Sequence, residues 1–380
     1  MQIAMEPNSN SKVPTSCTEN QRLRDKKVKN LTADKRRLVE VPHTATLAHT
    51  MNALVANGVV ALPVAAPPGH WIGAGGSMIL ESDKQTGAVR KHYIGMVTML
   101  DILAHFAGDD DMESGDVFDV DQRLSVPVSS IIGHCIESLS LWTLNPSTGI
   151  LDCMEVFSKG IHRALVPLDS QMENVSGVEL IESASSYRMV TQMDILRFLK
   201  EHASELKDVM PHTVSDLGAI TENVFALTSR TKVIEAIKCM RAASLNAVPI
   251  VEASDALQED HKQLTNGKGR KLIGTFSATD LRGCPIAQLQ SWLPLSVLDF
   301  TQKGSTRHAA ASELGISPRE LVTCNAESSL AQAIDKAVTT HVHRVWVVDQ
   351  QGLLIGLVSL TDMIRVIRVS LLSDPPANVI

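Results

Sequence analysis

Four near copies of one stretch in this chain of 380 residues each carry a serine or threonine followed three residues later by an aspartate. The copies are TMLD (Thr98–Asp101), TQMD (Thr191–Asp194), SATD (Ser277–Asp280) and SLTD (Ser359–Asp362). At the start of a helix, the hydroxyl and the carboxylate can each bond a free backbone N–H and form a capping box. The same groups can hold a nucleotide, because a helix N-terminus favours phosphate and a carboxylate can accept both ribose hydroxyls. The motif by itself favours the capping interpretation, since capping boxes begin many helices.

Two His-Arg pairs shift the balance toward a phosphate ligand. His162-Arg163 begins the apolar stretch HRALVPL, and His343-Arg344 begins HRVWVV. A charged group is poorly placed there for core packing. Arginine offers a planar fork to phosphate oxygens, and histidine can add a hydrogen bond. The alternative, in which the pairs lie at the rim and neutralise nearby acids, stays open from the sequence alone.

Both features belong to a unit that occurs four times and reads helix, strand, strand, helix. Apolar residues at helical spacing follow a hydroxyl residue at Thr46, Thr148, Thr231 and Ser329, most loosely after Thr148. A short apolar strand comes next, and a second strand then leads into the Ser/Thr-x-x-Asp motif. In the fourth unit the two strands are joined by the tight turn DQQGLL. In the other units this connection is swollen, as at 65–92 and 252–271, so the insertions leave the repeated core intact.

The composition excludes several classes of protein. A net charge of −7, a pI near 6.0 and only 3% aromatic residues argue against nucleic-acid binding. No apolar run of about 18 residues is present, so we expect no membrane span and no signal peptide. The six cysteines are scattered without zinc-like spacing, and His341 and His343 lack a third ligand, so no metal is predicted. No catalytic constellation stands apart from the repeats, so we predict that the chain is not an enzyme.

The expected location is the cytoplasm. The basic segment 22–37 could also act as a nuclear-import patch or contact an acidic partner, which would add the nucleus. A solvated helix that leads into the first repeat is the simpler interpretation of this segment.

The repeated unit resembles the cystathionine-β-synthase (CBS) domain, whose motif is a Gly-apolar-x-Ser/Thr-x-x-Asp lead into its last helix. From about Lys35 onward, the chain resembles the gamma regulatory subunit of the AMP-activated and sucrose-non-fermenting-related protein kinase family. The stretches that carry this resemblance are LVEVPHTATLAHTMNALVANGVVALPV from Leu38 and VHRVWVVDQQGLLIGLVSLTDMIRVI from Val342. The polar start, the swollen connections and the weak second repeat resemble a plant gamma-like member.

The resemblance implies an α+β fold of four tandem CBS repeats, arranged as two Bateman modules in a flat, pseudo-symmetric disk. The expected divisions are a mobile polar and basic tail (1–34), repeat one (35–107), an acidic, extended linker (108–124), repeat two (125–204), repeat three (205–290) and repeat four (291–380).

The resemblance also implies a non-catalytic regulatory subunit of a heterotrimeric Ser/Thr protein kinase, with the catalytic (alpha) and scaffold (beta) subunits as partners. No cofactor is required, and the implied ligands are AMP, ADP or ATP, bound between repeats with their phosphates toward a central channel. The implied ribose contacts are Asp101, Asp194, Asp280 and Asp362. The implied phosphate contacts are His162, Arg163, His343, Arg344 and Thr361, together with the hydroxyl of Ser359.

Some positions depart from the family pattern. Val60 stands in NGVVALP where the family carries an arginine, and Arg188 replaces the motif glycine of repeat two, where its side chain could crowd the cleft. The third repeat has Asn246-Ala247 where the basic pair would stand, although the family lacks the pair there too. These departures support an alternative hypothesis, in which the chain is a CBS-fold scaffold that has lost nucleotide binding and acts only through protein contacts.

Overall fold

The computed structural model describes residues 23–67, 92–107, 120–133, 141–168, 186–254, 259–281, 288–310 and 321–373. Most of the expected tail, nearly all of the first two swollen connections and residues 108–119 of the expected linker lie outside these ranges. None of the helices in the described part of the chain has the length and apolar character needed to cross a lipid bilayer.

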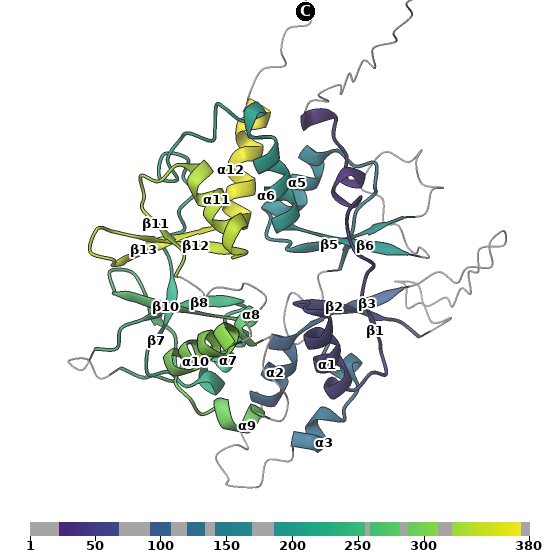
Figure 1. Cartoon of the computed structure of the whole chain (residues 1–380), viewed down its shortest axis with the longest axis vertical. Coiled ribbons are helices and arrows are strands. Elements are labelled where there is room, and N and C mark those ends of the chain that lie inside the picture. Colours follow the sequence, from purple (N-terminus) through teal and green to yellow (C-terminus); the bar gives the residue numbers. More distant parts are fainter. Residues whose placement is uncertain are drawn as a thin grey trace, which may run out of the picture.

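Each repeat consists of a short strand, a helix, two antiparallel strands and a second helix (Figure 1). Repeat one contains β1 (Val41–Pro42), α1 (Leu47–Asn57), β2 (Ala61–Ala65), β3 (Tyr93–Thr98) and α2 (Met99–Ala107). Repeat two contains β4 (Trp142–Thr143), α5 (Ile150–Ser158), β5 (Arg163–Pro167), β6 (Tyr187–Thr191) and α6 (Gln192–Glu201). Repeat three contains β7 (Phe225–Thr228), α7 (Val233–Ala242), β8 (Ala247–Val251), β10 (Leu272–Ser277) and α8 (Ala278–Leu281). Repeat four contains β11 (Thr323–Cys324), α11 (Leu330–Thr340), β12 (Arg344–Val348), β13 (Leu354–Ser359) and α12 (Leu360–Ser373).

The predicted order of helix, strand, strand, helix is present in all four repeats, and one strand was missed in each. The missed strand pairs in parallel with the first of the two longer strands, as Val41 of β1 does with Val64 of β2. Strands this short show no hydrophobic periodicity, so the sequence pattern could not reveal them.

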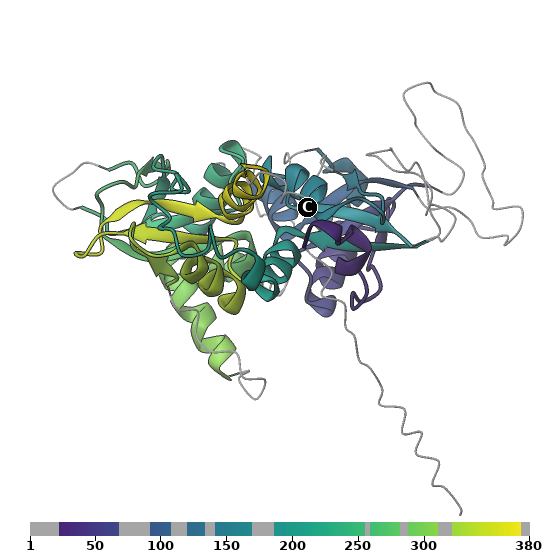
Figure 2. The same ribbon diagram turned by 90° about the horizontal axis from the view of Figure 1, so that it is seen from above.

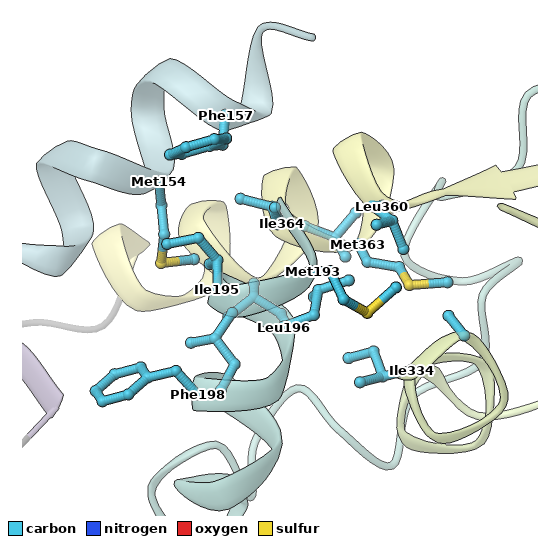
Figure 3. Close-up of a cluster of buried hydrophobic side chains, with 14 of the residues drawn as sticks. Met154, Phe157, Met193, Ile195, Leu196, Phe198, Ile334, Leu360, Met363 and Ile364 are labelled. Atoms are coloured by element: carbon cyan, nitrogen blue, oxygen red, sulfur yellow. The ribbon is translucent and has the colours of Figure 1, made fainter. Parts of the chain in front are cut away.

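The helices pack in two cores, and each core joins repeats that are distant in the sequence. Helices of repeats one and three share one buried cluster, which includes Leu54 and Ile237. Helices of repeats two and four share the other, which includes Phe157 and Ile364 (Figure 3). The sheets of repeats one and two lie next to each other, as do those of repeats three and four, while the helices occupy the two outer ends (Figure 1). Seen from above, the molecule is flat, and α10 (Val297–Ala310) projects from one face (Figure 2).

In each half of the chain, the segment that precedes the first repeat packs on the second repeat of that half. The segment before repeat one contains η1 (Leu23–Asp25) and η2 (Val28–Leu31) and packs on repeat two, where Val28 N donates to the Thr148 carbonyl at 2.9 Å. The segment before repeat three likewise packs on repeat four, where Val214 N donates to the Ser328 carbonyl at 2.9 Å. The segments that follow repeats one and three fold back on the repeat they follow. They contain α3 (Val120–Leu124) with η4 (Val128–Ser130), and α9 (Leu289–Trp292) with the start of α10.

This packing of the connecting segments corrects several predicted divisions of the chain. The prediction of a mobile tail is wrong for residues 23–34, because Leu23 and Val28 are buried in the core of repeat two. The prediction of an extended linker is wrong at its end, because α3 is a helix that contacts α1. Residues 205–221 were assigned to repeat three, but the segment 206–221, which follows η6 (Ala203–Glu205), packs on repeat four. Residues 125–131 were assigned to repeat two and pack on repeat one.

Residues 259–271 of the third swollen connection form an ordered segment that joins repeats three and four. Its strand β9 (Thr265–Asn266) pairs with β7, and an ion pair of 2.6 Å between Arg270 and Glu259 closes its base. Gly269 N donates to the Leu354 carbonyl at 2.7 Å, and Leu354 N donates to the Arg270 carbonyl at 2.8 Å. The insertion therefore extends the contact between the two sheets.

Candidate functional site

The four Ser/Thr-x-x-Asp motifs each stand where a strand runs into a helix, and in each the aspartate caps that helix. The Oδ2 atom of the aspartate accepts hydrogen bonds from the backbone N–H and the hydroxyl of the Ser or Thr, at 2.6–3.1 Å. In three of them the hydroxyl also accepts from the aspartate N–H, at 3.1–3.4 Å. Each cap engages one carboxylate oxygen, so Oδ1 is the atom that differs between repeats.

The surroundings of the four carboxylates are not equivalent. Asp101 is 1% exposed, and its Oδ1 has no hydrogen-bond partner among the residues that the structure describes. Asp194 forms an ion pair of 2.5 Å with Lys35, through Oδ2. Asp362 Oδ1 lies 3.3 Å from the guanidinium of Arg365 on the same helix. Asp280 is half-buried.

Strand register brings the His-Arg pairs to the same place as the capping boxes. In the antiparallel hairpins, Arg163 lies opposite Thr191, and Arg344 lies opposite Ser359. The equivalent positions in repeats one and three are held by alanines, which lie opposite Thr98 and Ser277. Each arginine is therefore a direct cross-strand neighbour of the residue that caps the following helix.

The two basic pairs converge from repeats two and four. Burial, together with the nearby charges of Arg163, His343 and Arg344, lowers the pKa of His162 to about 3. Burial and the same two guanidinium groups together lower the pKa of His343 to about 4. The residue His343 lies where the cluster meets solvent, and its pKa is lowered less than that of His162. At neutral pH the cluster therefore consists of two neutral imidazoles and two guanidinium groups.

Residues from all four repeats contribute to this centre. Burial lowers the pKa of Arg163, while the carboxylate of Asp101 in repeat one opposes that shift. Burial lowers the pKa of Arg344 to about 10. An Arg344 N–H donates to the Ala247 carbonyl of repeat three at 2.7 Å, and the buried Nε has no partner within the described chain. We call these five residues, His162, Arg163, His343, Arg344 and Asp101, the basic centre.

Two of the other predicted positions are engaged by partners that the sequence did not reveal. Thr361 accepts a hydrogen bond of 2.8 Å from the side chain of Gln192, which also donates to the Phe157 carbonyl and so ties α6 to α12. Arg188 donates from Nε to the Lys35 carbonyl at 2.9 Å and from a guanidinium N–H to the Tyr187 carbonyl at 3.3 Å. Its side chain thus holds the segment that precedes repeat one. Val60 is half-buried directly before β2 and brings no charge to the centre.

No cluster of three metal-binding side chains occurs in the described part of the chain. His341, which the sequence paired with His343 as a candidate metal ligand, instead lies 2.8 Å from a guanidinium nitrogen of Arg197 through Nδ1.

The lowered histidine pKa values predict that acid destabilises the fold. Because the folded-state values lie below the ordinary value of 6.5, the unfolded chain binds more protons between those limits. The stabilisation is fully present above about pH 6.5 and is lost as pH falls toward 4. After allowance for the exposure of His343, we expect a loss of about 1 kcal/mol per pH unit in this window.

Urea unfolding at pH 7.5 and pH 5.0 measures this effect. The double variant His162→Gln/His343→Gln should show a clearly shallower pH dependence than the wild type. The exposed His49 on α1 provides the control, since His49→Gln should leave the wild-type dependence intact. An unchanged slope in the double variant would contradict the assignment.

The fold and the centre agree with what comparisons with known proteins find. The CBS domain family matches residues 312–369, which include the fourth motif. A solved structure from Methanocaldococcus jannaschii, described as a candidate archaeal homologue of the gamma subunit of AMP-activated kinase, superimposes with a TM-score of 0.58. It is 17% identical and covers 90% of this chain and 99% of its own, so it supports the fold alone. The chain is thus a four-repeat CBS protein.

Proteins with similar sequences show which family of CBS proteins the chain belongs to. The SNF1-related protein kinase regulatory subunit gamma-like PV42a of Arabidopsis thaliana is 61% identical and covers 93% of this chain and 97% of its own length. PV42b of the same plant is 59% identical over 93% of this chain and 98% of its own. The gamma subunit of the 5'-AMP-activated protein kinase of Saccharomyces cerevisiae is 23% identical over 87% of this chain and 86% of its own. The chain belongs to the family of gamma-like regulatory subunits of SNF1-related protein kinases, a family of regulatory proteins and not of enzymes.

Proposed function

We propose that this chain binds an adenine nucleotide at the fourth-repeat motif, with the phosphates on the basic centre. The observation that carries this proposal is the convergence of the His162-Arg163 and His343-Arg344 pairs beside the capping box of Asp362. The buried guanidinium groups of Arg163 and Arg344 bring positive charge to the centre, and the carboxylate of Asp101 acts on Arg163. A phosphate would offset this charge, and each charge-assisted hydrogen bond would contribute about 1.5–3 kcal/mol.

The two oxygens of the Asp362 carboxylate have different partners, and this leaves Oδ1 for a ribose contact. Its Oδ2 is used in the cap, while Oδ1 contacts the partly exposed Arg365 at 3.3 Å. Arg365 also donates to the Gly218 carbonyl at 2.9 Å, which holds the guanidinium at the edge of the motif. Because the arginine of this pair is 43% exposed, the pair contributes little to stability, and ribose hydroxyls can compete for Oδ1.

Calorimetric titration of the full chain with AMP and with ATP tests this site. We expect Asp362→Ala to weaken binding about tenfold or more, because it removes the ribose acceptor. Asp335→Ala on α11 is the matched control, since it removes an exposed acid of the same repeat without touching the motif. Thermal unfolding of both variants checks that they are folded at the titration temperature. Absence of heat with every adenine nucleotide would contradict nucleotide sensing and favour the scaffold alternative.

The proposed partners are the catalytic (alpha) and scaffold (beta) subunits of an SNF1-related kinase. This part of the proposal is supported by PV42a and PV42b, which are named as gamma-like regulatory subunits of SNF1-related kinase and match the chain along nearly its whole length. A nucleotide bound at the centre would regulate the kinase by binding more tightly to one conformation of the complex than to the other. We further propose that the complex is cytoplasmic and also nuclear.

Purification of native kinase complexes from the source tissue tests the partnership. The chain should be recovered with a kinase catalytic subunit in a stoichiometric complex. Absence of the chain from every such complex would remove the kinase assignment while leaving the nucleotide measurement unaffected.

A further inference from the structure

Repeats two and four present their motifs to equivalent connecting segments, and the two segments differ in charge. The segment 23–35 lies across repeat two, where Lys27 bridges to Gly149, and the segment 206–221 lies across repeat four, where Thr213 bridges to Ser329. Each is the connection that precedes the first repeat of its half. The fourth repeat therefore serves as an internal reference for the second.

In repeat four the segment meets the motif through its backbone. The Gly218 carbonyl accepts from Arg365, and Thr221 exchanges two hydrogen bonds with Leu357 of β13, at 2.8 and 3.0 Å. Among the described residues, the charged group in contact with Asp362 is Arg365 of its own helix. The segment thus brings no cation to this carboxylate.

In repeat two the segment brings a lysine. The Lys35 ammonium lies 2.5 Å from Asp194 Oδ2, and the two side chains are 28% and 10% exposed. The backbone of Lys35 is fixed at the same time, because Arg188 donates to its carbonyl at 2.9 Å. Arg188 stands where repeat four has the motif glycine, Gly356. The two basic residues therefore act together, with Arg188 positioning the segment and Lys35 pairing with the acid.

We propose that Lys35 closes the second-repeat motif to nucleotides and so decides which motifs of the chain are binding sites. Lys35 contacts Oδ2 and Arg197 lies 3.9 Å from Oδ1, so a ribose hydroxyl would have to compete with two cations for a carboxylate that is 10% exposed. A neutral donor cannot replace either charge. This inference rests on the proposed function, in that the motif aspartates are taken as ribose acceptors. It assigns specificity to a residue outside the repeated units, and it excludes Asp194 from the native set of ligands.

Calorimetric titration with AMP on the full chain tests the inference through the number of bound molecules. Lys35→Met should add one AMP per chain relative to the wild type, and Lys35→Met/Asp194→Asn should lose that added molecule. Lys35→Arg is the matched control, because it keeps the positive charge and should add none. Lys35→Gln serves as a second variant that removes the charge while keeping a polar side chain, and thermal unfolding verifies that each protein is folded.

The outcomes separate this inference from the proposed function. If Lys35→Met and Lys35→Gln bind no more AMP than the wild type does, the inference is overturned. The proposed function is tested separately, by the effect of Asp362→Ala on AMP binding to the otherwise wild-type chain. A negative result in that test does not change the number of AMP molecules that Lys35→Met gains at Asp194. An added molecule that persists after Asp194→Asn would also overturn the inference, because the gain would then lie elsewhere.

Discussion

Replacement of Asp101 by alanine is expected to lower the free energy of unfolding by about 3 kcal/mol. The carboxylate is 1% exposed and accepts two hydrogen bonds from Thr98, through its N–H at 2.7 Å and its hydroxyl at 2.6 Å. Alanine would leave both donors without their acceptor inside the protein. It would also remove the negative charge that opposes the effect of burial on the Arg163 guanidinium. The loss of the Asp101 charge beside the buried Arg163 guanidinium is expected to be the larger of these two effects.

Chemical denaturation of the full chain measures this prediction. Asp101→Asn separates the two effects, because the amide oxygen can still accept from Thr98 while the charge is absent. Asp280→Ala is the matched control for loss of the cap at a less buried position, since this aspartate makes the same two bonds with Ser277 on a half-buried helix start. We expect its cost to be about 1 kcal/mol. Equal losses for Asp101→Ala and Asp280→Ala would show that the buried charge plays no part.

A methyl group at Gly356 is expected to destabilise the fold by about 3 kcal/mol. The added Cβ would lie 2.6 Å from the Thr221 carbonyl oxygen and 2.7 Å from Ile220 Cγ2. That oxygen accepts from Leu357 N, so it cannot move aside without breaking the bridge between the segment 206–221 and β13. The glycine of the fourth motif is therefore required because another stretch of backbone crosses it closely.

The same position in repeat three provides the comparison. A Cβ at Gly274 would meet Ile250 Cδ1 at 3.2 Å, and this atom is the flexible end of a side chain. Gly274→Ala should therefore cost less than about 1 kcal/mol. Urea unfolding of the two single variants measures both costs. A loss of unfolding free energy for Gly274→Ala as large as that for Gly356→Ala would contradict the backbone-crossing explanation.

The sequence predicted the repeated core well because local signals and packing agree there. Thr46, Thr191 and Ser329 each cap the helix that follows, as a hydroxyl residue before an apolar pattern predicts. The sequence pattern did not predict burial where it depends on contact with a distant segment of the chain. Leu23 and Val28 stand alone among polar neighbours, so nothing in the sequence shows that they are buried against repeat two.

The candidate site was predictable in its residue types and not in its contacts. The His-Arg pairs and the motif aspartates could be named from their repeated positions, but their convergence depends on how the repeats pair across the disk. The ion pair of Lys35 with Asp194 joins residues far apart in the chain, and its only sequence signal is a basic segment of no particular pattern. The bond between Gln192 and Thr361 has no sequence signal either, because each residue looks like an ordinary member of a helix start.

The pairing of helices between the two halves also sets an order for biosynthesis. α2 of repeat one packs against α7 of repeat three, and α5 and α6 of repeat two pack against α12 of repeat four. While the chain is being made, the first half therefore emerges from the ribosome with the apolar faces of these helices still uncovered. They stay open to chaperones, or to the same faces on another nascent chain, until the second half has been translated. A transcript truncated between the halves would consequently yield a product with two uncovered apolar surfaces, and we expect it to self-associate or be degraded.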